Sequence, residues 1–292
     1  MKNLSKVTAI LVLYDTSDII HKCLENLKDV NIIIVDNGKN RKSLIDIIKK
    51  NKNIIKYLKP KKNLGFGRAC NLAFKYVKTD YTLLIEPDVI ISPKNIYNLI
   101  ITIEKYPRTG IVAPTLINNN NEIVDKLENF PEYGKNVIRS LHEKTINFQI
   151  ENKFIEGDTC VNFCWAAILL LNNEIIKKTG LFNKKIFLFW EDFYLCRKLR
   201  DAKISIIKSS SSKAIHLERM STRVNFYNYF IMQKHHVQSS YVYFRVKKNN
   251  SDLTKRLFLY FLRSFGYLCI LNLKKSLKNI ARFCAVFTYK FR

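Results

Sequence analysis

The sequence predicts an α/β fold that is followed by a basic helical region. Short apolar runs of strand length recur through most of the chain, and segments with helical periodicity separate them. Several of these runs end in an acid or a turn residue. With 292 residues, of which 47% are hydrophobic, the chain is long enough for one large domain plus an appendage.

The first two predicted strands cover residues 7–14 and 31–35. The second leads directly into Asp36, Asn37 and Gly38. Ligands of open α/β sheets bind outside the carboxyl ends of the strands, so Asp36 is a candidate for contacting a base or a ribose. An Asx turn that closes the strand would give the same pattern.

A glycine-containing loop follows the third predicted strand, residues 54–58, and precedes a helix predicted over 69–77. Gly65 and Gly67 would allow a close approach of the backbone, and Arg68 adds a positive charge. The loop is therefore a candidate phosphate site, although a Gly-x-Gly pair also occurs in ordinary tight turns.

Two acids flank a proline after the fourth predicted strand, residues 81–85. In a chain of formal net charge +26, Glu86 and Asp88 make sense as ligands of a hard divalent cation, with diphosphate oxygens and water as further ligands. A Pro-Asp turn is the alternative. His216 ends a later strand, and it would be a metal ligand only if the fold brings it to Asp88; otherwise its role is structural.

Three further stretches are predicted between the motifs. Ser92 and Pro93 predict the N-cap and first residue of a helix. Residues 114–156 are rich in Asn, Glu and Lys without clean periodicity, and they are predicted to form an insertion or flexible loop. A strand is predicted over 203–208.

The segment 187–200 predicts a helix that opens with an acidic pair beside aromatic residues. Leu195 and Leu199 follow helical spacing, and Glu191 and Asp192 lie in the first turn, where the helix dipole favours negative charge. Aromatic neighbours shift the pKa of a carboxylate toward neutrality, as a general base requires. An acidic helix start without chemistry is the alternative.

In this order, these motifs resemble those of the family 2 glycosyltransferases with the GT-A fold, especially a rhamnosyltransferase-like branch that builds bacterial surface polysaccharide. The resemblance covers about residues 6–245 and implies a mixed sheet flanked by helices over residues 1–225. It rests on six segments and one histidine: 14–15, 35–38, 63–71, 86–88, 180–183, 187–199 and His216.

The resemblance also implies roles for individual residues. Nucleotide-sugar contacts fall on Tyr14, Asp36, Asn63, Gly65, Arg68, Asn71, Glu86 and Asp88. Metal contacts fall on Asp88 and His216, with Mg²⁺ or Mn²⁺ as the cofactor. Asp192 is implied as the base with Glu191 beside it, and the acceptor site would include Trp165, Trp190 and Tyr194.

Four positions depart from the family pattern. Glu86 replaces a neutral amide, and Tyr194 stands where a second aspartate is usual. Trp165 stands where a small residue, often glycine, is usual, and Ala202 replaces the glycine that usually follows the acceptor helix. These departures concern acceptor and sugar specificity, and they keep open a second class: a catalytically weak nucleotide-sugar-binding or scaffold protein of a polysaccharide assembly complex.

The implied reaction is inverting, metal-dependent transfer of a sugar, with rhamnose as one candidate. The donor would be a nucleotide-diphosphate sugar, and the acceptor a lipid-linked or growing surface glycan. A nucleotidyltransferase fits less well, because residues 14–17 lack the basic, glycine-rich loop that normally follows the first strand of that class.

The region 226–292 carries 13 lysines and arginines against the single acid Asp252, with aromatic residues interleaved. This pattern predicts an amphipathic basic surface that lies on an anionic membrane. Arg263 interrupts the longest apolar stretch, residues 257–273, so a spanning helix is not expected. Helices packed on the domain, with a solvated basic face, are the alternative.

Other sequence features bear on partners and location. Nucleic acid is not an expected partner, because no reading motif is present and the strand-end acids would repel a phosphate backbone. No N-terminal signal sequence is visible, and seven cysteines without Cys-x-x-Cys spacing fit reduced thiols. We therefore expect a cytoplasmic protein, peripheral on the inner face of the plasma membrane.

Overall fold

The computed structural model describes residues 4–15, 20–38, 42–124, 157–217 and 225–291. These residues form two compact units. The first unit contains the described residues up to 182 and again from 192 to 217, and the second contains 183–191 and the described residues from 225 onward. The stretch 183–191, expected in the first domain, thus groups with the C-terminal helices.

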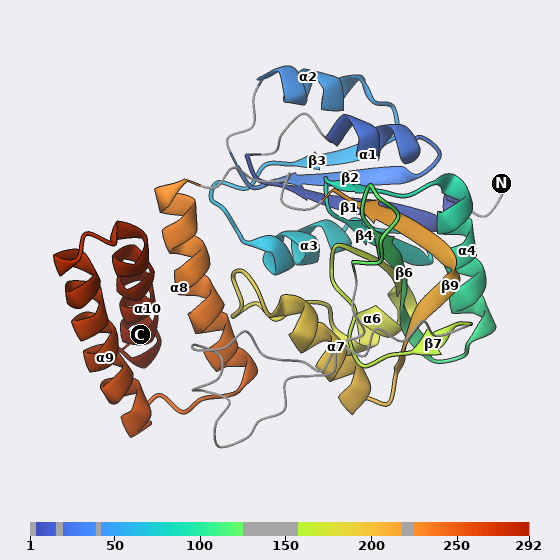
Figure 1. Ribbon diagram of the computed structural model, residues 1–292. Coiled ribbons are helices and arrows are strands. Elements are labelled where there is room, and N and C mark those ends of the chain that lie inside the picture. The colour runs from blue at the N-terminus through green and yellow to red at the C-terminus, as the bar shows by residue number, and fades with distance from the viewer. Residues whose placement is uncertain (1–3, 16–19, 39–41, 125–156, 218–224, 292) are drawn as a thin grey trace. The chain divides into compact units, whose positions relative to one another are not determined.

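The first unit is built on a mixed sheet, which has nine strands among the described residues and the order β3-β2-β1-β4-β8-β6-β9-β5, with β7 paired to β9 (Figure 1). β1 is parallel to β2 and β4, β2 is parallel to β3, and β8 is antiparallel to β4 and β6. The α/β fold predicted from the sequence is confirmed. The strands are β1 (Val7–Leu13), β2 (Asn31–Asp36), β3 (Ile54–Leu58), β4 (Tyr81–Ile85), β5 (Val89–Ile90), β6 (Thr109–Ile117), β7 (Thr159–Cys160), β8 (Ile168–Asn172) and β9 (Ser205–His216).

Helices cover both faces of this sheet, because successive residues of its central strands point to opposite sides. Leu11 of β1 belongs to one hydrophobic core and Ile10 to the other. The second core also contains Leu195 of the helix predicted over 187–200. The helices of this unit are η1 (Leu4–Lys6), α1 (Ile20–Asn26), α2 (Lys42–Lys50), α3 (Phe66–Phe74), α4 (Pro93–Lys105), α6 (Asn173–Thr179) and α7 (Glu191–Asp201).

Two local predictions can be followed in the described residues. Ser92 caps α4 by accepting a hydrogen bond from the Asn95 N–H at 3.3 Å, and Pro93 is the first helical residue, as predicted. The predicted insertion begins later than residue 114, because 114–117 belong to β6. Residues 125–156 lie outside the described part of the chain.

The second unit contains three long helices, α8 (Phe226–Tyr243), α9 (Ser251–Cys269) and α10 (Leu273–Phe291) (Figure 1). α9 and α10 pack as an antiparallel hairpin, and Gln238 of α8 donates a hydrogen bond to Thr288 of α10 at 2.5 Å. Ser239 of α8 donates to the Leu188 carbonyl at 2.7 Å, which holds the stretch 183–191 in this unit.

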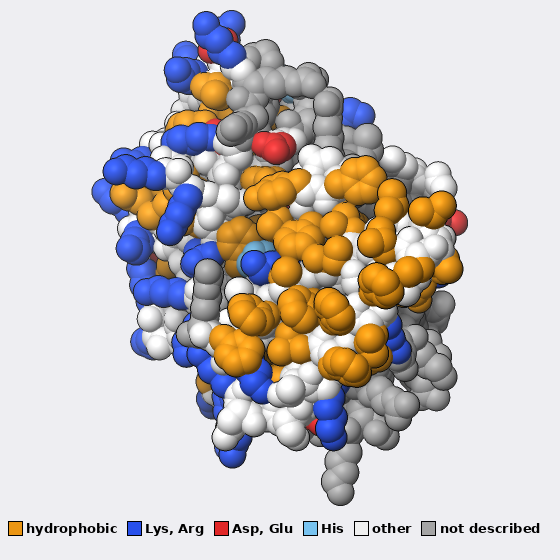
Figure 2. All heavy atoms as spheres, turned by 90° about the vertical axis from the view of Figure 1, so that its left-hand side faces the viewer, with side chains coloured by type: hydrophobic (Ala, Val, Ile, Leu, Met, Phe, Trp, Pro, Cys, Tyr) orange, Lys and Arg blue, Asp and Glu red, His pale blue; other side chains and the backbone are white. Residues whose placement is uncertain are grey.

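The helical hairpin leaves many large apolar side chains exposed, and Figure 2 shows hydrophobic side chains gathered on this face with Lys and Arg side chains at its border. None of the helices in the described ranges is long and apolar enough to cross a membrane. The exposed apolar residues of the hairpin, here called the apolar face, are Phe258, Leu259, Phe261, Leu262, Phe265, Leu268, Ile270, Leu271, Leu273, Ile280, Phe287 and Phe291.

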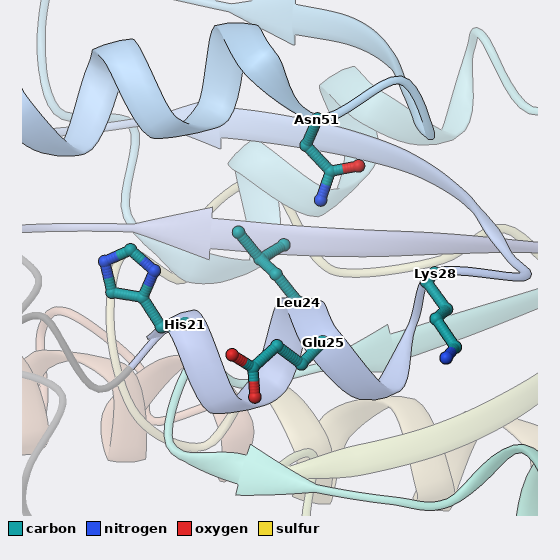
Figure 3. A pocket seen from close by; sticks show the side chains of 5 residues that line it. All are labelled: His21, Leu24, Glu25, Lys28 and Asn51. Atoms are coloured by element: carbon teal, nitrogen blue, oxygen red, sulfur yellow. The ribbon is translucent and has the colours of Figure 1, made fainter.

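A hollow in the first unit lies along α1 and is lined by His21, Leu24, Glu25, Lys28 and Asn51 (Figure 3). None of these residues belongs to the site predicted from the sequence.

Candidate active site

The carboxyl ends of β1, β2 and β4 lie at one edge of the sheet. Leu13 pairs with Asp36, and Ile10 pairs with Leu84, in parallel registers. The segments that follow these strands, including Tyr14 and Glu86, therefore start from the same edge, where open α/β sheets bind ligands.

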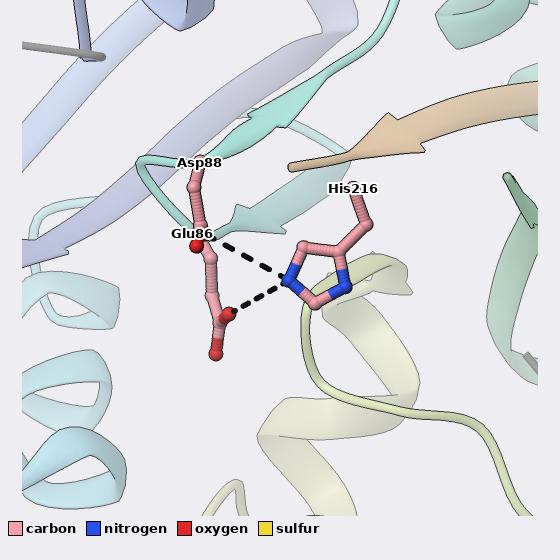
Figure 4. A group of neighbouring side chains, drawn as sticks. All are labelled: Glu86, Asp88 and His216. Atoms are coloured by element: carbon pink, nitrogen blue, oxygen red, sulfur yellow. Dashed lines mark ion pairs between the residues drawn. The ribbon is translucent and has the colours of Figure 1, made fainter. Parts of the chain in front are cut away.

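Glu86, Asp88 and His216 form one cluster, in which a ligand atom from each residue lies within 4.8 Å of the other two. His216 Nε2 is 3.8 Å from Glu86 Oε2 and 3.8 Å from Asp88 Oδ1 (Figure 4). The cluster exists because β5 pairs antiparallel with the end of β9, with Val89 opposite His216. The fold thus meets the condition under which His216 was predicted to be a metal ligand.

The electrostatics of this cluster fit a cation. Asp88 is 1% exposed, and its Oδ1 has no hydrogen-bond partner among the described residues. Burial, together with the charges of Asp88 and Asp192, raises the pKa of Glu86 to about 8. A divalent ion would bind Asp88 Oδ1 and would offset the repulsion between the carboxylates of Glu86 and Asp88. Two carboxylates and an imidazole are suitable ligands for Mn²⁺, and the carboxylate oxygens also suit Mg²⁺.

Asp192 lies in the first turn of α7, beside this cluster. Its Oδ1 accepts a hydrogen bond from the Phe193 N–H at 2.8 Å. Burial raises the pKa of Asp192 to about 6, although backbone N–H groups of Phe193 and Ala166 oppose the shift. This is the direction predicted from the sequence. A carboxylate with this pKa is suited to accept a proton near neutral pH.

Aromatic rings surround the start of α7 within the first unit. Phe163 stacks on Phe193 with ring centroids 4.1 Å apart and meets Trp165 edge-on at 5.4 Å. Trp165 is 42% exposed. A ring this exposed can be reached from solvent, and its place in the acceptor site stays a prediction. Tyr194 is half-buried on the same helix.

Trp190 and Glu191 group with the second unit. Trp190 is buried, and its ring lies 5.2 Å from that of Tyr243 and 5.3 Å from that of Phe244. Glu191 is also buried. Of the predicted acceptor residues, Trp190 thus contacts the end of α8, and these contacts give it a packing role.

The turn that precedes α7 has an unusual backbone. Phe189 and Trp190 have φ angles of 63° and 67°, in the left-handed region that non-glycine residues rarely adopt. Such strain clusters at functional sites, where surrounding packing maintains it. Here it directly precedes Glu191 and Asp192, and no Gly or Asn in the sequence signals it.

Asp36 is held by several protein groups at the end of β2. It is fully buried, accepts a hydrogen bond from the Tyr57 hydroxyl at 2.5 Å and pairs with Lys59 at 2.7 Å. The Gly38 N–H donates to its Oδ1 at 3.1 Å, so the Asx turn considered from the sequence is present. Tyr57 of β3 was missed by sequence reasoning.

Gly38 also allows the turns after β1 and β2 to meet. A Cβ atom at this position would lie 2.6 Å from the Asp15 backbone nitrogen and 3.0 Å from the Tyr14 Cα. Any side chain here would push Tyr14 away from the strand ends.

The predicted phosphate loop is closed by its own side chains. Gly65, with φ 76°, precedes α3, and its N–H donates to Asn63 Oδ1 at 2.8 Å. Arg68 Nε donates to the Leu64 carbonyl at 2.6 Å. Asn37, another residue missed from the sequence, donates to the Gly65 carbonyl at 3.1 Å and accepts from the Leu64 N–H at 3.2 Å. Asn37 thereby fastens the loop to the end of β2.

Asn71 connects α3 to the loop before α7. Its amide donates to the Phe182 carbonyl at 2.8 Å and accepts from the Phe182 N–H at 3.0 Å. Lys198 of α7 donates to the carbonyls of Gly180 and Leu181, the latter at 2.6 Å. Asn71 and Lys198 thus position the loop from two helices. Lys198 was missed because its role depends on contacts across the fold.

A family model described as glycosyl transferase family 2 matches residues 8–172, more than half of the chain. The chain belongs to glycosyltransferase family 2. This family 2 glycosyltransferase is 25% identical over 260 residues to the rhamnosyltransferase WbbL of Escherichia coli K12, and the match covers 83% of the chain and 94% of WbbL. It is 29% identical over 120 residues to a teichoic acid poly(glycerol phosphate) polymerase of Staphylococcus epidermidis, covering 38% of the chain but only 16% of that polymerase.

Solved structures show that this family 2 glycosyltransferase has the GT-A fold. Staphylococcus aureus TarS matches with a TM-score of 0.53 and 13% identity, covering 97% of the chain and 89% of that structure. The mannosyltransferase PcManGT of Pyrobaculum calidifontis, solved with GDP-Man and Mn²⁺, matches with a TM-score of 0.55 and 11% identity over 97% of the chain and 73% of its own. The family assignment made from the motifs is confirmed.

Proposed function

We propose that this family 2 glycosyltransferase transfers a sugar, with inversion, from a nucleoside-diphosphate donor to a hydroxyl group of a lipid-linked or growing surface glycan. The observation that carries the proposal is the juxtaposition of two sites at the sheet edge. Glu86, Asp88 and His216 form a cation site, and the charge of Asp192 acts directly on Glu86.

The donor nucleotide is assigned to the strand ends of the first half of the sheet. Tyr14 and Asp36 would contact the base and ribose, and the loop containing Asn63, Gly65 and Arg68 would approach the diphosphate. The strand ends and the loop would be held in place by four residues through the hydrogen bonds and the ion pair described above: Asn37, Tyr57, Lys59 and Asn71.

The residues of the cation site would hold the cation that binds the donor diphosphate. Asp88 and His216 would hold Mg²⁺ or Mn²⁺, with Glu86 as a further ligand. When bound, the cation supplies positive charge to the leaving diphosphate. Asp192, whose pKa burial raises to about 6, would accept the proton of the attacking hydroxyl. The hydroxyl would attack the anomeric carbon in line, which inverts its configuration.

The identity of the sugar is proposed from one relative, and the acceptor contact is proposed from one exposed side chain. The match to WbbL extends along nearly its whole length, which makes a rhamnosyl donor the first candidate. Trp165 is exposed beside α7 and would stack on a sugar ring of the acceptor. Tyr194 stands where an acid is expected, which favours a second candidate: a catalytically weak nucleotide-sugar-binding or scaffold protein.

The C-terminal unit is proposed to hold the enzyme on the cytoplasmic face of the plasma membrane. Its apolar face would enter the lipid interface, and its many lysines and arginines would attract anionic headgroups. In a vesicle-sedimentation assay, the full chain should bind phosphatidylglycerol vesicles at low salt and bind more weakly as salt rises. Phe261→Ser together with Phe265→Ser should weaken the binding that persists at high salt. Absence of binding at low salt would reject this part of the proposal.

The catalytic proposal is tested with a panel of nucleotide sugars, including rhamnosyl, mannosyl and N-acetylglucosaminyl donors, with Mn²⁺, Mg²⁺ or EDTA. The stabilisation of the protein by each donor and the release of nucleoside diphosphate are both measured. At least one donor should stabilise the protein only with the cation and should be turned over. Donor binding without any hydrolysis or transfer would instead support the scaffold class, and no donor binding would reject both.

A further inference from the structure

Ser239 of α8 donates its hydroxyl hydrogen to a residue outside its own helix. The acceptor is the Leu188 carbonyl, 2.7 Å from Ser239 Oγ, and Ser239 is 2% exposed. Serine hydroxyls inside helices commonly bond to a carbonyl of the same helix. The neighbouring Ser240 does so, with the Val237 carbonyl as its acceptor at 2.8 Å. Two adjacent buried serines thus hold different groups: Ser240 bonds within α8, whereas Ser239 holds the backbone of the turn that precedes α7.

Aromatic contacts from the same face of α8 flank this hydrogen bond. The ring centroid of His235 lies 4.3 Å from that of Phe187, and the ring centroid of Tyr243 lies 5.2 Å from that of Trp190. His235, Ser239 and Tyr243 are spaced four residues apart, so they share one face of the helix. This face therefore contacts the turn on both sides of the hydrogen-bonded carbonyl, and all of these residues belong to the second unit.

The turn needs such support because of its backbone. Phe189 and Trp190 have φ angles of 63° and 67°, and this left-handed conformation is unfavourable for residues with a Cβ atom. The Leu188 carbonyl belongs to the peptide group that joins Leu188 to Phe189. A hydrogen bond to this carbonyl fixes the orientation of that peptide plane, which in turn sets the φ angle of Phe189. Without the bond from Ser239, the turn would relax more readily toward ordinary backbone.

The helix that supplies this hydrogen bond is itself fixed within the second unit. Gln238, next to Ser239, donates a hydrogen bond to Thr288 of α10 at 2.5 Å. Just after the end of α8, the Val246 carbonyl accepts a hydrogen bond from the Tyr289 hydroxyl of α10 at 2.6 Å. A group can hold a strained turn only if its own position is fixed, and α8 meets this condition through its contacts with α10.

We propose that Ser239 is a positioning residue for the glycosyl transfer: its hydrogen bond to the Leu188 carbonyl sets the turn from which Glu191 and Asp192 enter α7. The proposal rests on the proposed function, in which Asp192 accepts the proton of the attacking hydroxyl. Because Glu191 and Asp192 directly follow Trp190, a change of φ at Trp190 redirects the first turn of α7. A base must lie within hydrogen-bond reach of the proton that it accepts, so this change lowers the rate.

The first arm of the test needs no substrate. Hydrogen–deuterium exchange of the full chain, followed in peptides that cover residues 183–195, reports how often the turn opens. Ser239→Ala should make exchange in this segment about tenfold faster, which corresponds to the loss of one hydrogen bond. Ser240→Ala is the matched control, because it removes an equally buried hydroxyl of the same helix. It should leave exchange in this segment unchanged.

The second arm measures what the turn contributes to catalysis. Release of nucleoside diphosphate from the rhamnosyl, mannosyl or N-acetylglucosaminyl donor gives kcat, and calorimetry of UDP and GDP with Mn²⁺ gives the nucleotide affinity. Ser239→Ala should lower kcat roughly 10- to 100-fold, the effect of a small misplacement of a catalytic group. Nucleotide affinity should not change, because the residues assigned to the nucleotide belong to the first unit. Ser239→Thr keeps the hydroxyl and should restore both exchange and kcat toward the wild type.

Three results would overturn the proposal: unchanged exchange in Ser239→Ala, an equal effect in Ser240→Ala, or faster exchange in Ser239→Ala with the kcat of the wild type. If the wild type turns over no donor, the proposed function fails, while faster exchange in Ser239→Ala would still establish that Ser239 holds the turn. If the wild type is active and Ser239→Ala exchanges normally, the proposed function stands and the role of Ser239 is rejected.

Discussion

The imidazole of His216 lies 3.8 Å from the Asp88 carboxylate, although Asp88 directly precedes β5 and His216 is the last residue of β9, far along the sequence. The main chain makes this contact possible. Val89 pairs with His216, and the Leu217 N–H donates to the Asp88 carbonyl at 2.9 Å. This short pairing of β5 with the end of β9 thereby completes the three-residue candidate cation site.

Replacing His216 by Ala should weaken cation binding but leave the carboxylates in place. We expect Mn²⁺ affinity of the donor-free protein to fall roughly 10- to 100-fold, the range seen when metal-site partners are removed. Electron paramagnetic resonance of free Mn²⁺ gives the affinity directly. His21→Ala, on α1 and outside the cluster, is the control and should change nothing. Unchanged Mn²⁺ affinity in His216→Ala would return His216 to a structural role.

Replacing Asp192 by Asn should lower turnover without lowering the affinity for the donor. Asparagine keeps the shape of the side chain but cannot accept the proton, so turnover should fall on the order of 10²–10⁴-fold with donor binding nearly unchanged. Glu191→Gln, the neighbouring control, should cost less. Higher residual activity in Asp192→Asn than in Glu191→Gln would transfer the role of base to Glu191.

The same Asp192→Asn variant should be more stable than the wild type at pH 7 without a cation. The folded-state pKa of Asp192 is raised to about 6, so its ionised form is favoured less in the folded than in the unfolded protein. Removing that charge should add on the order of 1 kcal/mol to the free energy of unfolding. Urea denaturation measures this, and the gain should shrink as the pH falls below 6. A less stable variant at pH 7 would show that the ionised form makes unrecognised favourable contacts.

Turnover should depend on pH through the same group. The base is the ionised carboxylate, so kcat/KM should fall as the pH drops through about 6. Bound cation favours ionisation and should move this limb to lower pH. A kcat/KM that rises as the pH falls through this range would contradict the role of Asp192 as the base.

Replacing Asn71 by Ala should loosen the loop before α7. Both hydrogen bonds to the Phe182 backbone are lost, which should cost about 1–3 kcal/mol of unfolding free energy. Asn71→Asp keeps the acceptor oxygen but not the N–H donor, so its free energy of unfolding should lie between those of the wild type and Asn71→Ala. Asn26→Ala, which removes an exposed hydrogen bond on α1, should cost less than about 0.5 kcal/mol. Equal losses in Asn71→Ala and Asn26→Ala would show that the loop does not depend on Asn71.

The sequence was sufficient for the first four strands, β1 to β4, and for the groups at their ends, because periodicity and turn residues are local signals. Asp36, Glu86 and Asp88 all follow predicted strands. The approach of His216 to Asp88 depends on the antiparallel register of β5 and β9, which no local pattern encodes. The sequence could state that condition but not establish that it is met.

The side chains that hold the site in place were the hardest to predict. Asn37 and Lys198 act through hydrogen bonds to distant backbone carbonyls, and such pairs carry no sequence spacing. The left-handed backbone at Phe189 and Trp190 depends on surrounding packing, and it contradicts their intrinsic preferences. In the C-terminal region, composition predicted a basic amphipathic surface, but it could not predict that the charge of Arg282 on α10 acts on Tyr260 of α9.

The central claim is that Glu86, Asp88 and His216 hold the cation required by the donor diphosphate. Calorimetric binding of UDP and GDP, with Mn²⁺ or EDTA, tests it most directly. At least one nucleotide should bind the wild type in a Mn²⁺-dependent manner, and Asp88→Ala should lose the Mn²⁺-dependent part while keeping its melting transition. Asp46→Asn, an exposed change on α2, should bind like the wild type. Wild-type affinity of Asp88→Ala for the nucleotide in Mn²⁺ would contradict the claim.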